Sequence, residues 1–147
     1  MDSRVAGRLY LLKMGMDIAK INLMRKILIV DDQPFICDLF SKVLANSATV
    51  ITSSSLEEAQ NVLSEHRVEL VISDLSLTED AGREGFTLLE HVRATSPDTK
   101  VIIMTGVGTD DTKEEALRLG AVHFLKKPFS LRNLLAEIRP FLNQQAT

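Results

Sequence analysis

Residues 26–35 read KILIVDDQPF, and they set the pattern that the rest of the chain repeats. Four consecutive aliphatic residues, Ile27 to Val30, lead directly into Asp31 and Asp32, and Pro34 follows two positions later. An aliphatic run of this kind is typical of a strand that is covered on both faces, as in a parallel sheet. Pro34 suits the first turn of a helix, where an N–H group would have no partner. The stretch therefore predicts a central strand, an acidic strand end and a helix.

The same alternation of strands and helices continues to about residue 143. Further strands are expected at residues 49–52, 68–73, 100–104 and 122–125. Helices are expected at residues 34–46, from Ser54 or Ser55 onward, and at residues 85–94, 110–119 and 130–139. Pro140 is expected to end or kink the last helix, because it lacks an amide hydrogen and clashes with the preceding turn. Five strand–helix units predict an α/β domain with a parallel sheet and helices on both faces.

Composition and charge limit the class of protein. The chain has 147 residues, of which 45% are hydrophobic and 25% are charged, which fits one globular domain. Its net charge of −3 argues against non-specific binding to nucleic acid. No apolar run approaches the roughly 18 residues that a membrane-spanning helix needs. The single Cys37 excludes an internal disulfide and a multi-cysteine metal site, and it fits a cytoplasmic location.

Residues 1–25 are expected to form an extension outside the domain, which is assigned to residues 26–143, with a tail at 144–147. The extension mixes basic and apolar residues, and its longest apolar run, residues 9–12, is too short for a signal peptide. Two interpretations stay open. One is a loose tail or an over-extended gene start, and the other is an amphipathic helix that packs on the domain or on a second copy of it.

Functional side chains are expected where the strands end, because an open parallel sheet binds ligands outside the carboxyl ends of its strands. The residues at these ends are Asp31 and Asp32, Asp74, Thr105 with Gly106, and Lys127 with Pro128. Three close carboxylates repel one another, and a hard divalent cation such as Mg²⁺ would relieve that repulsion. A lysine and a hydroxyl at the same place would bind phosphate oxygens. The set therefore suits phosphoryl transfer onto a carboxylate.

Four motifs make the chain resemble the receiver domains of two-component response regulators. They are ILIVDD (27–32), VISDL (71–75), VIIMTG (101–106) and FLKKPF (124–129), at the ends of the first, third, fourth and fifth strands. The resemblance covers about residues 25–143. It implies a flavodoxin-like (βα)5 fold, a doubly wound parallel sheet with strand order 2-1-3-4-5. It also implies a stand-alone phosphoacceptor for phosphorelay signalling rather than an enzyme.

The resemblance implies a role for each matched residue. Asp74 would accept the phosphoryl group. Mg²⁺ would be bound by Asp31, Asp32, Asp74 and the backbone carbonyl of Ser76. The phosphoryl group would be contacted by Thr105, Gly106 and Lys127. Phe124 would be the aromatic switch residue, and the Lys127–Pro128 bond would be cis.

The same resemblance implies partners. The phosphodonor would be a sensor histidine kinase or a histidine phosphotransfer protein, and an effector protein would act downstream. Partner binding would be switched at the face formed by the fourth helix, fifth strand and fifth helix (residues 110–119, 122–125 and 130–139). A homodimer would form through that face or through the N-terminal extension. Because the chain ends at Thr147, no output domain and no direct DNA binding are expected.

Two alternatives stay open. A receiver that no longer accepts phosphate would serve as a docking module, because the loop after Asp74 departs from the family pattern. Thr78 stands where the family usually has proline, and the family's glycine matches Gly85 only if residues 78–84 (TEDAGRE) hold an insertion of about three residues. The acids of this loop, Glu79, Asp80 and Glu84, would then alter metal access. The second alternative, a Mg²⁺-dependent phosphatase, would want an acid at position 76, where the chain has serine.

Overall fold

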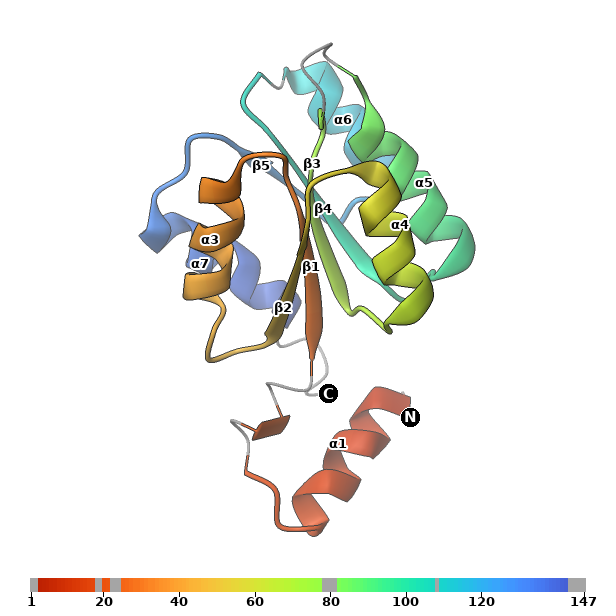
Figure 1. Ribbon diagram of the computed structural model, residues 1–147, viewed down its shortest axis with the longest axis vertical. Helices are drawn as coiled ribbons and strands as arrows, with labels where there is room; N and C mark the ends of the chain where they lie inside the picture. Colours follow the sequence, from red (N-terminus) through yellow and green to blue (C-terminus); the bar gives the residue numbers. More distant parts are fainter. Residues whose placement is uncertain (1–2, 18–19, 22–24, 78–81, 108, 143–147) are drawn as a thin grey trace.

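The computed structural model describes residues 3–17, 20–21, 25–77, 82–107 and 109–142 (Figure 1). Its centre is a single sheet of five parallel strands in the order β2-β1-β3-β4-β5, which confirms the predicted topology. The strands are β1 (Lys26–Val30), β2 (Thr49–Ser53), β3 (Leu70–Asp74), β4 (Lys100–Thr105) and β5 (His123–Lys126). All five therefore point their carboxyl ends toward the same edge of the sheet.

Helices cover both faces of the sheet (Figure 1). One face carries α3 (Pro34–Val43) and α7 (Leu131–Leu142), and the other carries α4 (Leu56–Glu65), α5 (Glu84–Thr95) and α6 (Asp110–Arg118). Side chains alternate along each strand, so Ile27 and Ile29 enter the first core whereas Leu28 and Val30 enter the second. This division explains why β1 is aliphatic at four consecutive positions.

The helices begin and end where their local sequence favours it. The side chain of Ser55 accepts a hydrogen bond from the Glu58 N–H at the start of α4, as a capping residue does. The Glu58 carboxylate accepts one from the Ser54 N–H in return. At the end of α6, Gly120 has a φ of +108°, which a glycine adopts without a steric penalty.

The last helix is longer than predicted. It continues through Pro140 to Leu142, so a helix end near Arg139 is wrong, whereas a kink at Pro140 stays a prediction. Leu142 is buried in the core beneath α3 and α7, and Phe141 packs on that core and on the His123 ring, with centroids 5.6 Å apart. Pro140 removes a single donor close to the end of the helix, and the burial of the two residues after it offsets that loss.

Residues before the domain form a separate helix, α1 (Ser3–Lys13). It lies apart from the sheet in Figure 1, and Tyr10 and Met14 are exposed. Arg25 is buried, and its carbonyl oxygen accepts a hydrogen bond of 2.7 Å from the Thr49 N–H of β2, so contact with the domain begins before β1. The boundary between an extension and a domain at residue 26 stays a prediction. In the part of the chain that the structure describes, none of the helices has the length and apolar character required to cross a bilayer.

Candidate functional site

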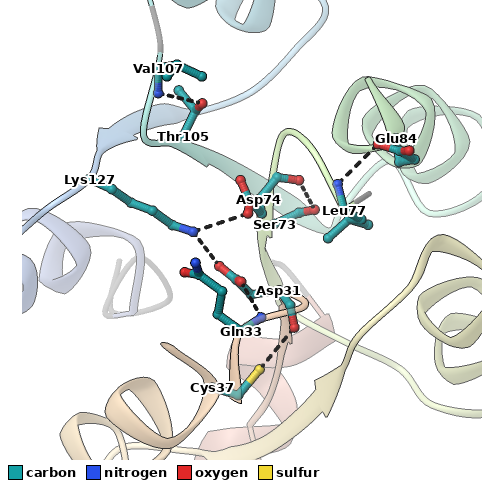
Figure 2. A network of polar contacts seen from close by, with 10 residues as sticks. All are labelled: Asp31, Gln33, Cys37, Ser73, Asp74, Leu77, Glu84, Thr105, Val107 and Lys127. Carbon is teal, nitrogen blue, oxygen red and sulfur yellow. Dashed lines mark hydrogen bonds and ion pairs between the residues drawn. The ribbon is translucent and has the colours of Figure 1, made fainter. Parts of the chain in front are cut away.

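Three carboxylates, Asp31, Asp32 and Asp74, meet at the carboxyl ends of β1 and β3, and Figure 2 shows two of them, Asp31 and Asp74. Asp31 and Asp32 directly follow β1, and Asp74 is the last residue of the neighbouring β3. One oxygen from each carboxylate lies within 4.8 Å of the other two. Asp31 and Asp74 are buried, whereas Asp32 is exposed. This acid cluster therefore opens to solvent on the side of Asp32.

Lys127 reaches the cluster from the loop that follows β5. Its Nζ atom lies 2.7 Å from Asp31 Oδ2 and 3.1 Å from Asp74 Oδ2, so one ammonium bridges two carboxylates. The Lys127 N–H donates to the carbonyl oxygen of Thr105 over 2.8 Å, which fixes the loop to the end of β4. The peptide bond between Lys127 and Pro128 is cis. The ammonium is thus positioned by two neighbouring strands as well as by its ionic partners.

Burial and charge act on the titration of this network. Burial raises the pKa of Asp74, the Asp31 charge adds to that rise, and Lys127 only partly opposes it. Burial alone would lower the pKa of Lys127, but the hydrogen bonds and charges of Asp31 and Asp74 outweigh burial, so the pKa of Lys127 is raised. One ammonium therefore does not compensate the cluster fully. An excess of negative charge on oxygen atoms alone suits a hard divalent cation.

The backbone around Asp31 holds its carboxylate in place. The Gln33 N–H donates to Asp31 Oδ1 over 2.9 Å, and the Cys37 thiol donates to the Asp31 carbonyl oxygen over 3.5 Å (Figure 2). Burial, reinforced by the Asp31 charge, raises the pKa of Cys37, so this thiol stays protonated at neutral pH. Cys37 therefore supports the site as a neutral packing residue.

Thr105 and Gly106 lie at the end of β4, next to the strand that carries Asp74. Thr105 is buried, and its Oγ1 atom accepts a hydrogen bond of 3.3 Å from the Val107 N–H. Gly106 and Val107 are exposed. A β-carbon at Gly106 would lie 4.0 Å from Lys127 Cβ, so this corner is close to the lysine without being crowded. The structure thus places the predicted hydroxyl beside the acid cluster (Figure 2).

Phe124 lies away from the acid cluster. It is half-buried on β5, packs against the core beneath α4, α5 and α6, and lines a cleft together with Thr109 and Lys113 of the α6 region. Its neighbour in register on β4 is Ile103, two residues before Thr105. The structure therefore separates Phe124 from the carboxylates and places it under the face formed by α6, β5 and α7.

The loop after Asp74 is anchored on the side opposite Lys127. The Ser76 N–H donates to the Asp74 carboxylate, and the Leu77 N–H donates to Glu84 Oε2 over 3.1 Å. Figure 2 shows the Glu84 carboxylate beyond Leu77, on the far side of Asp74 from Lys127. Glu84 therefore closes its own loop instead of lining the acid cluster, which sequence reasoning did not foresee. Thr78, Glu79 and Asp80, where an altered loop was expected, lie outside the described residues.

Gly85 allows the loop to return close to Asp74. A β-carbon at this position would lie 2.5 Å from the Asp74 carbonyl oxygen and 2.7 Å from Leu75 Cα, closer than atoms can approach. The Gly85 N–H donates to the Leu75 carbonyl oxygen over 2.8 Å. The start of α5 therefore packs directly on the backbone that follows Asp74, and only glycine fits there.

The amino-acid sequence is similar to those of response regulators. The response regulator receiver domain family matches residues 27–139. The response regulator protein PilR of Pseudomonas aeruginosa is 32% identical over 126 residues, which cover 83% of this chain and 28% of that protein. The chain spans between 23% and 52% of the length of the four curated relatives compared.

Solved receiver structures share the fold. The CheY-like receiver domain protein of Methanospirillum hungatei superposes with a TM-score of 0.74 at 27% identity, covering 83% of this chain and 96% of that one. The beryllofluoride-activated NtrC4 receiver domain dimer gives a TM-score of 0.75 at 30% identity, covering 84% and 100%. The chain therefore belongs to the response regulator receiver domain family.

Proposed function

We propose that the chain accepts a phosphoryl group on Asp74 from a histidine kinase or a histidine phosphotransfer protein, in a reaction that depends on Mg²⁺. Receiver domains of this family are signalling phosphoacceptors. The observation that carries the proposal for this chain is Lys127, whose Nζ atom bridges Asp31 and Asp74 beside a third carboxylate. We also propose that the chain carries out this signalling in the cytoplasm.

The residues suit an in-line transfer. A carboxylate oxygen of Asp74 would form a new P–O bond while the P–N bond of a phosphohistidine breaks, and the imidazole that leaves would take up a proton. Lys127 would move one of its hydrogen bonds from Asp74 to a phosphoryl oxygen while keeping Asp31. Thr105 would donate its hydroxyl proton to another phosphoryl oxygen. Each of these groups stabilises charge that moves onto the phosphoryl oxygens.

Asp31, Asp32, Asp74 and the Ser76 carbonyl would hold Mg²⁺. When bound, the ion would neutralise charge shared by the carboxylates and the phosphoryl group. The oxygen-only donor set and the raised pKa of Asp74 fit this ion. The exposure of Asp32 leaves the cluster accessible from solvent.

We propose that phosphorylation switches the face formed by α6, β5 and α7. The Thr105 hydroxyl would exchange the Val107 N–H for the phosphoryl group, and Phe124 would move inward under α6. Addition of Mg²⁺ together with beryllofluoride, the reagent that activates the NtrC4 receiver domain, should shift the amide resonances of Val107, His123 and Phe124. It should leave those at the end of α4 unchanged. Shifts confined to the acid cluster would contradict the switch.

One labelling experiment tests the phosphoacceptor function. The purified chain is incubated with Mg²⁺ and radiolabelled acetyl phosphate, and an acid-stable, base-labile phosphoprotein is expected. Asp74→Asn and removal of Mg²⁺ should each abolish the label. Asp98→Asn, an exposed aspartate at the far edge of the sheet, should keep it. Label that survives in Asp74→Asn would overturn the proposal.

The same experiment separates the alternatives. An absence of label on a folded chain would favour a docking module that does not accept phosphate. Continuous release of phosphate over many turnovers would favour a phosphatase. Neither alternative has a feature in the described residues that specifically supports it, and the intact bridge through Lys127 speaks against the docking module.

A further inference from the structure

A polar cavity lies at the amino-terminal ends of the strands, opposite the acid cluster. It has a volume of about 240 Å³ and lies between the start of β1, the end of α3 and the end of α7. Four polar residues contribute to its lining, namely Arg25, Asn46, Ser47 and Arg139, beside apolar Val43 and Leu135. None of the described residues that line it is acidic.

Arg25 is the unusual member of this lining. Only 5% of the residue is exposed, and its Nε and Nη2 atoms are buried without a hydrogen-bond partner among the residues that the structure describes. Its one ion-pair partner among the described residues is the carboxylate of Glu69, 4.0 Å from Nε, which is too far for a hydrogen bond. A buried guanidinium with unused N–H groups is unfavourable unless an acceptor reaches it.

The surroundings of Arg25 favour an anionic acceptor. Arg139 brings a second guanidinium to the same cavity, and Asn46 and Ser47 add side chains that can donate hydrogen bonds. The planar guanidinium matches the spacing of two oxygens in a carboxylate or a phosphate. The cavity is also far larger than the space that one water molecule needs.

We propose that this cavity binds a small oxyanion, with phosphate or carboxylate oxygens accepting hydrogen bonds from Arg25 and Arg139. The site is distinct from the acid cluster and does not depend on phosphorylation of Asp74. An occupant would link the residue that precedes β1 to the last turns of α3 and α7.

Titration by NMR tests the proposal on the full chain without Mg²⁺. Inorganic phosphate and acetate are added separately, at an ionic strength kept constant with chloride. At least one of them should produce saturable shifts of the amides of Asn46, Ser47 and Leu135. Arg139→Gln should weaken binding about tenfold, the effect of losing one charge-assisted contact. Arg132→Gln, an exposed arginine two turns earlier in α7, should leave the affinity unchanged.

Comparison of the two anions shows whether the cavity prefers phosphate or carboxylate ligands. Saturation by phosphate alone assigns a phosphate-type ligand, and saturation by acetate alone assigns a carboxylate. A lack of saturation with both anions would overturn the proposal, as would equal weakening by Arg139→Gln and Arg132→Gln. Arg25→Met provides a second measurement: its folding is checked by circular dichroism, and the rise in Tm that the anion gives the parent chain should be lost. A rise that persists would also overturn the proposal.

Discussion

At the scale of single residues, Asp31, Asp74 and Lys127 form a network in which two buried carboxylates share one ammonium. The ionised form of Asp74 is the least favourable member of this network, because burial and the Asp31 charge raise its pKa. Protonation of Asp74 is therefore more favourable in the folded chain than in the unfolded chain. Its contribution to stability is largest below the ordinary value of 3.8 and falls as the pH rises through the raised value.

Neutralising Asp74 should therefore stabilise the metal-free protein at pH 7. We expect Asp74→Asn to raise Tm by about 2–4 °C, which corresponds to roughly 1 kcal/mol for a chain of this size. Asparagine still offers Lys127 an oxygen, so the hydrogen bond is kept while the charge is removed. Scanning calorimetry in a Mg²⁺-free buffer measures the effect, and Asp98→Asn provides the control. A Tm that falls would show that the ion pair with Lys127 outweighs the cost of burial.

Lys127 has the opposite dependence on pH. Its pKa is raised above the ordinary 10.5, so its contribution is fully present below that pH and is lost as the pH rises through the higher folded value. We expect Lys127→Met to destabilise the chain by about 2–3 kcal/mol at pH 8 and to have a smaller effect above pH 10.5. Urea unfolding at several pH values measures both. Lys126→Met, at the exposed neighbouring position, should show neither effect.

The charged members of the site could be predicted because they occupy strand ends. Asp31, Asp74 and Lys127 each stand where an aliphatic run stops, and a parallel sheet brings such positions to one edge. The hydrogen bonds that hold the loops around these charged residues could not be predicted from the sequence. The bond from Cys37 to the Asp31 carbonyl oxygen and the bond from Leu77 to Glu84 depend on how loops close, and neither follows from periodicity.

At the scale of elements, α5 begins unusually close to the end of β3. Gly85 makes this possible, and we expect Gly85→Ala to cost about 1–3 kcal/mol because the methyl group would meet backbone atoms that cannot move aside. Gly7→Ala in the exposed α1 is the matched control. Nothing lies within 4 Å of a β-carbon there, so that change should be neutral or slightly stabilising. Equal urea midpoints for Gly85→Ala and the parent would contradict the close packing.

The elements differ in how well their sequence predicts them. The strands and the capped starts of α4 and α6 follow local rules, and the structure has them within about two residues of expectation. The end of α7 does not, because Pro140 favours a stop while the burial of Leu142 favours continuation. Tertiary packing decides that competition, and it is not visible in the local sequence.

At the scale of the whole molecule, the acid cluster should link cation binding to global stability. A cation that binds the folded chain alone stabilises it by about 1.4 kcal/mol at ten times Kd. We expect Mg²⁺ to raise the urea midpoint of the parent chain, to have little effect on Asp32→Asn, and to act normally on Asp98→Asn. Asp32 is exposed, so its replacement should not disturb folding. An undiminished response in Asp32→Asn would place the cation elsewhere.

Two sites of opposite charge lie at the two ends of the strands. Three carboxylates meet at the carboxyl ends, whereas two arginines line the cavity between β1, α3 and α7 at the amino-terminal ends. Both α3 and α7 run from one end toward the other (Figure 1). The sequence predicted the first site through its motifs, but Arg25 and Arg139 are 114 positions apart and only the fold brings them together.

Direct localisation of the phosphoryl group tests the central claim. The chain is incubated with Mg²⁺ and acetyl phosphate, the acyl phosphate is reduced with borohydride to mark the modified carboxyl group, and the peptides are sequenced by mass spectrometry. We predict that the mark lies at Asp74 and that it is absent from Asp31 and Asp32. A mark at another residue, or an unmodified Asp74 in a folded chain with Mg²⁺ bound, would contradict the assignment of Asp74 as the phosphoacceptor.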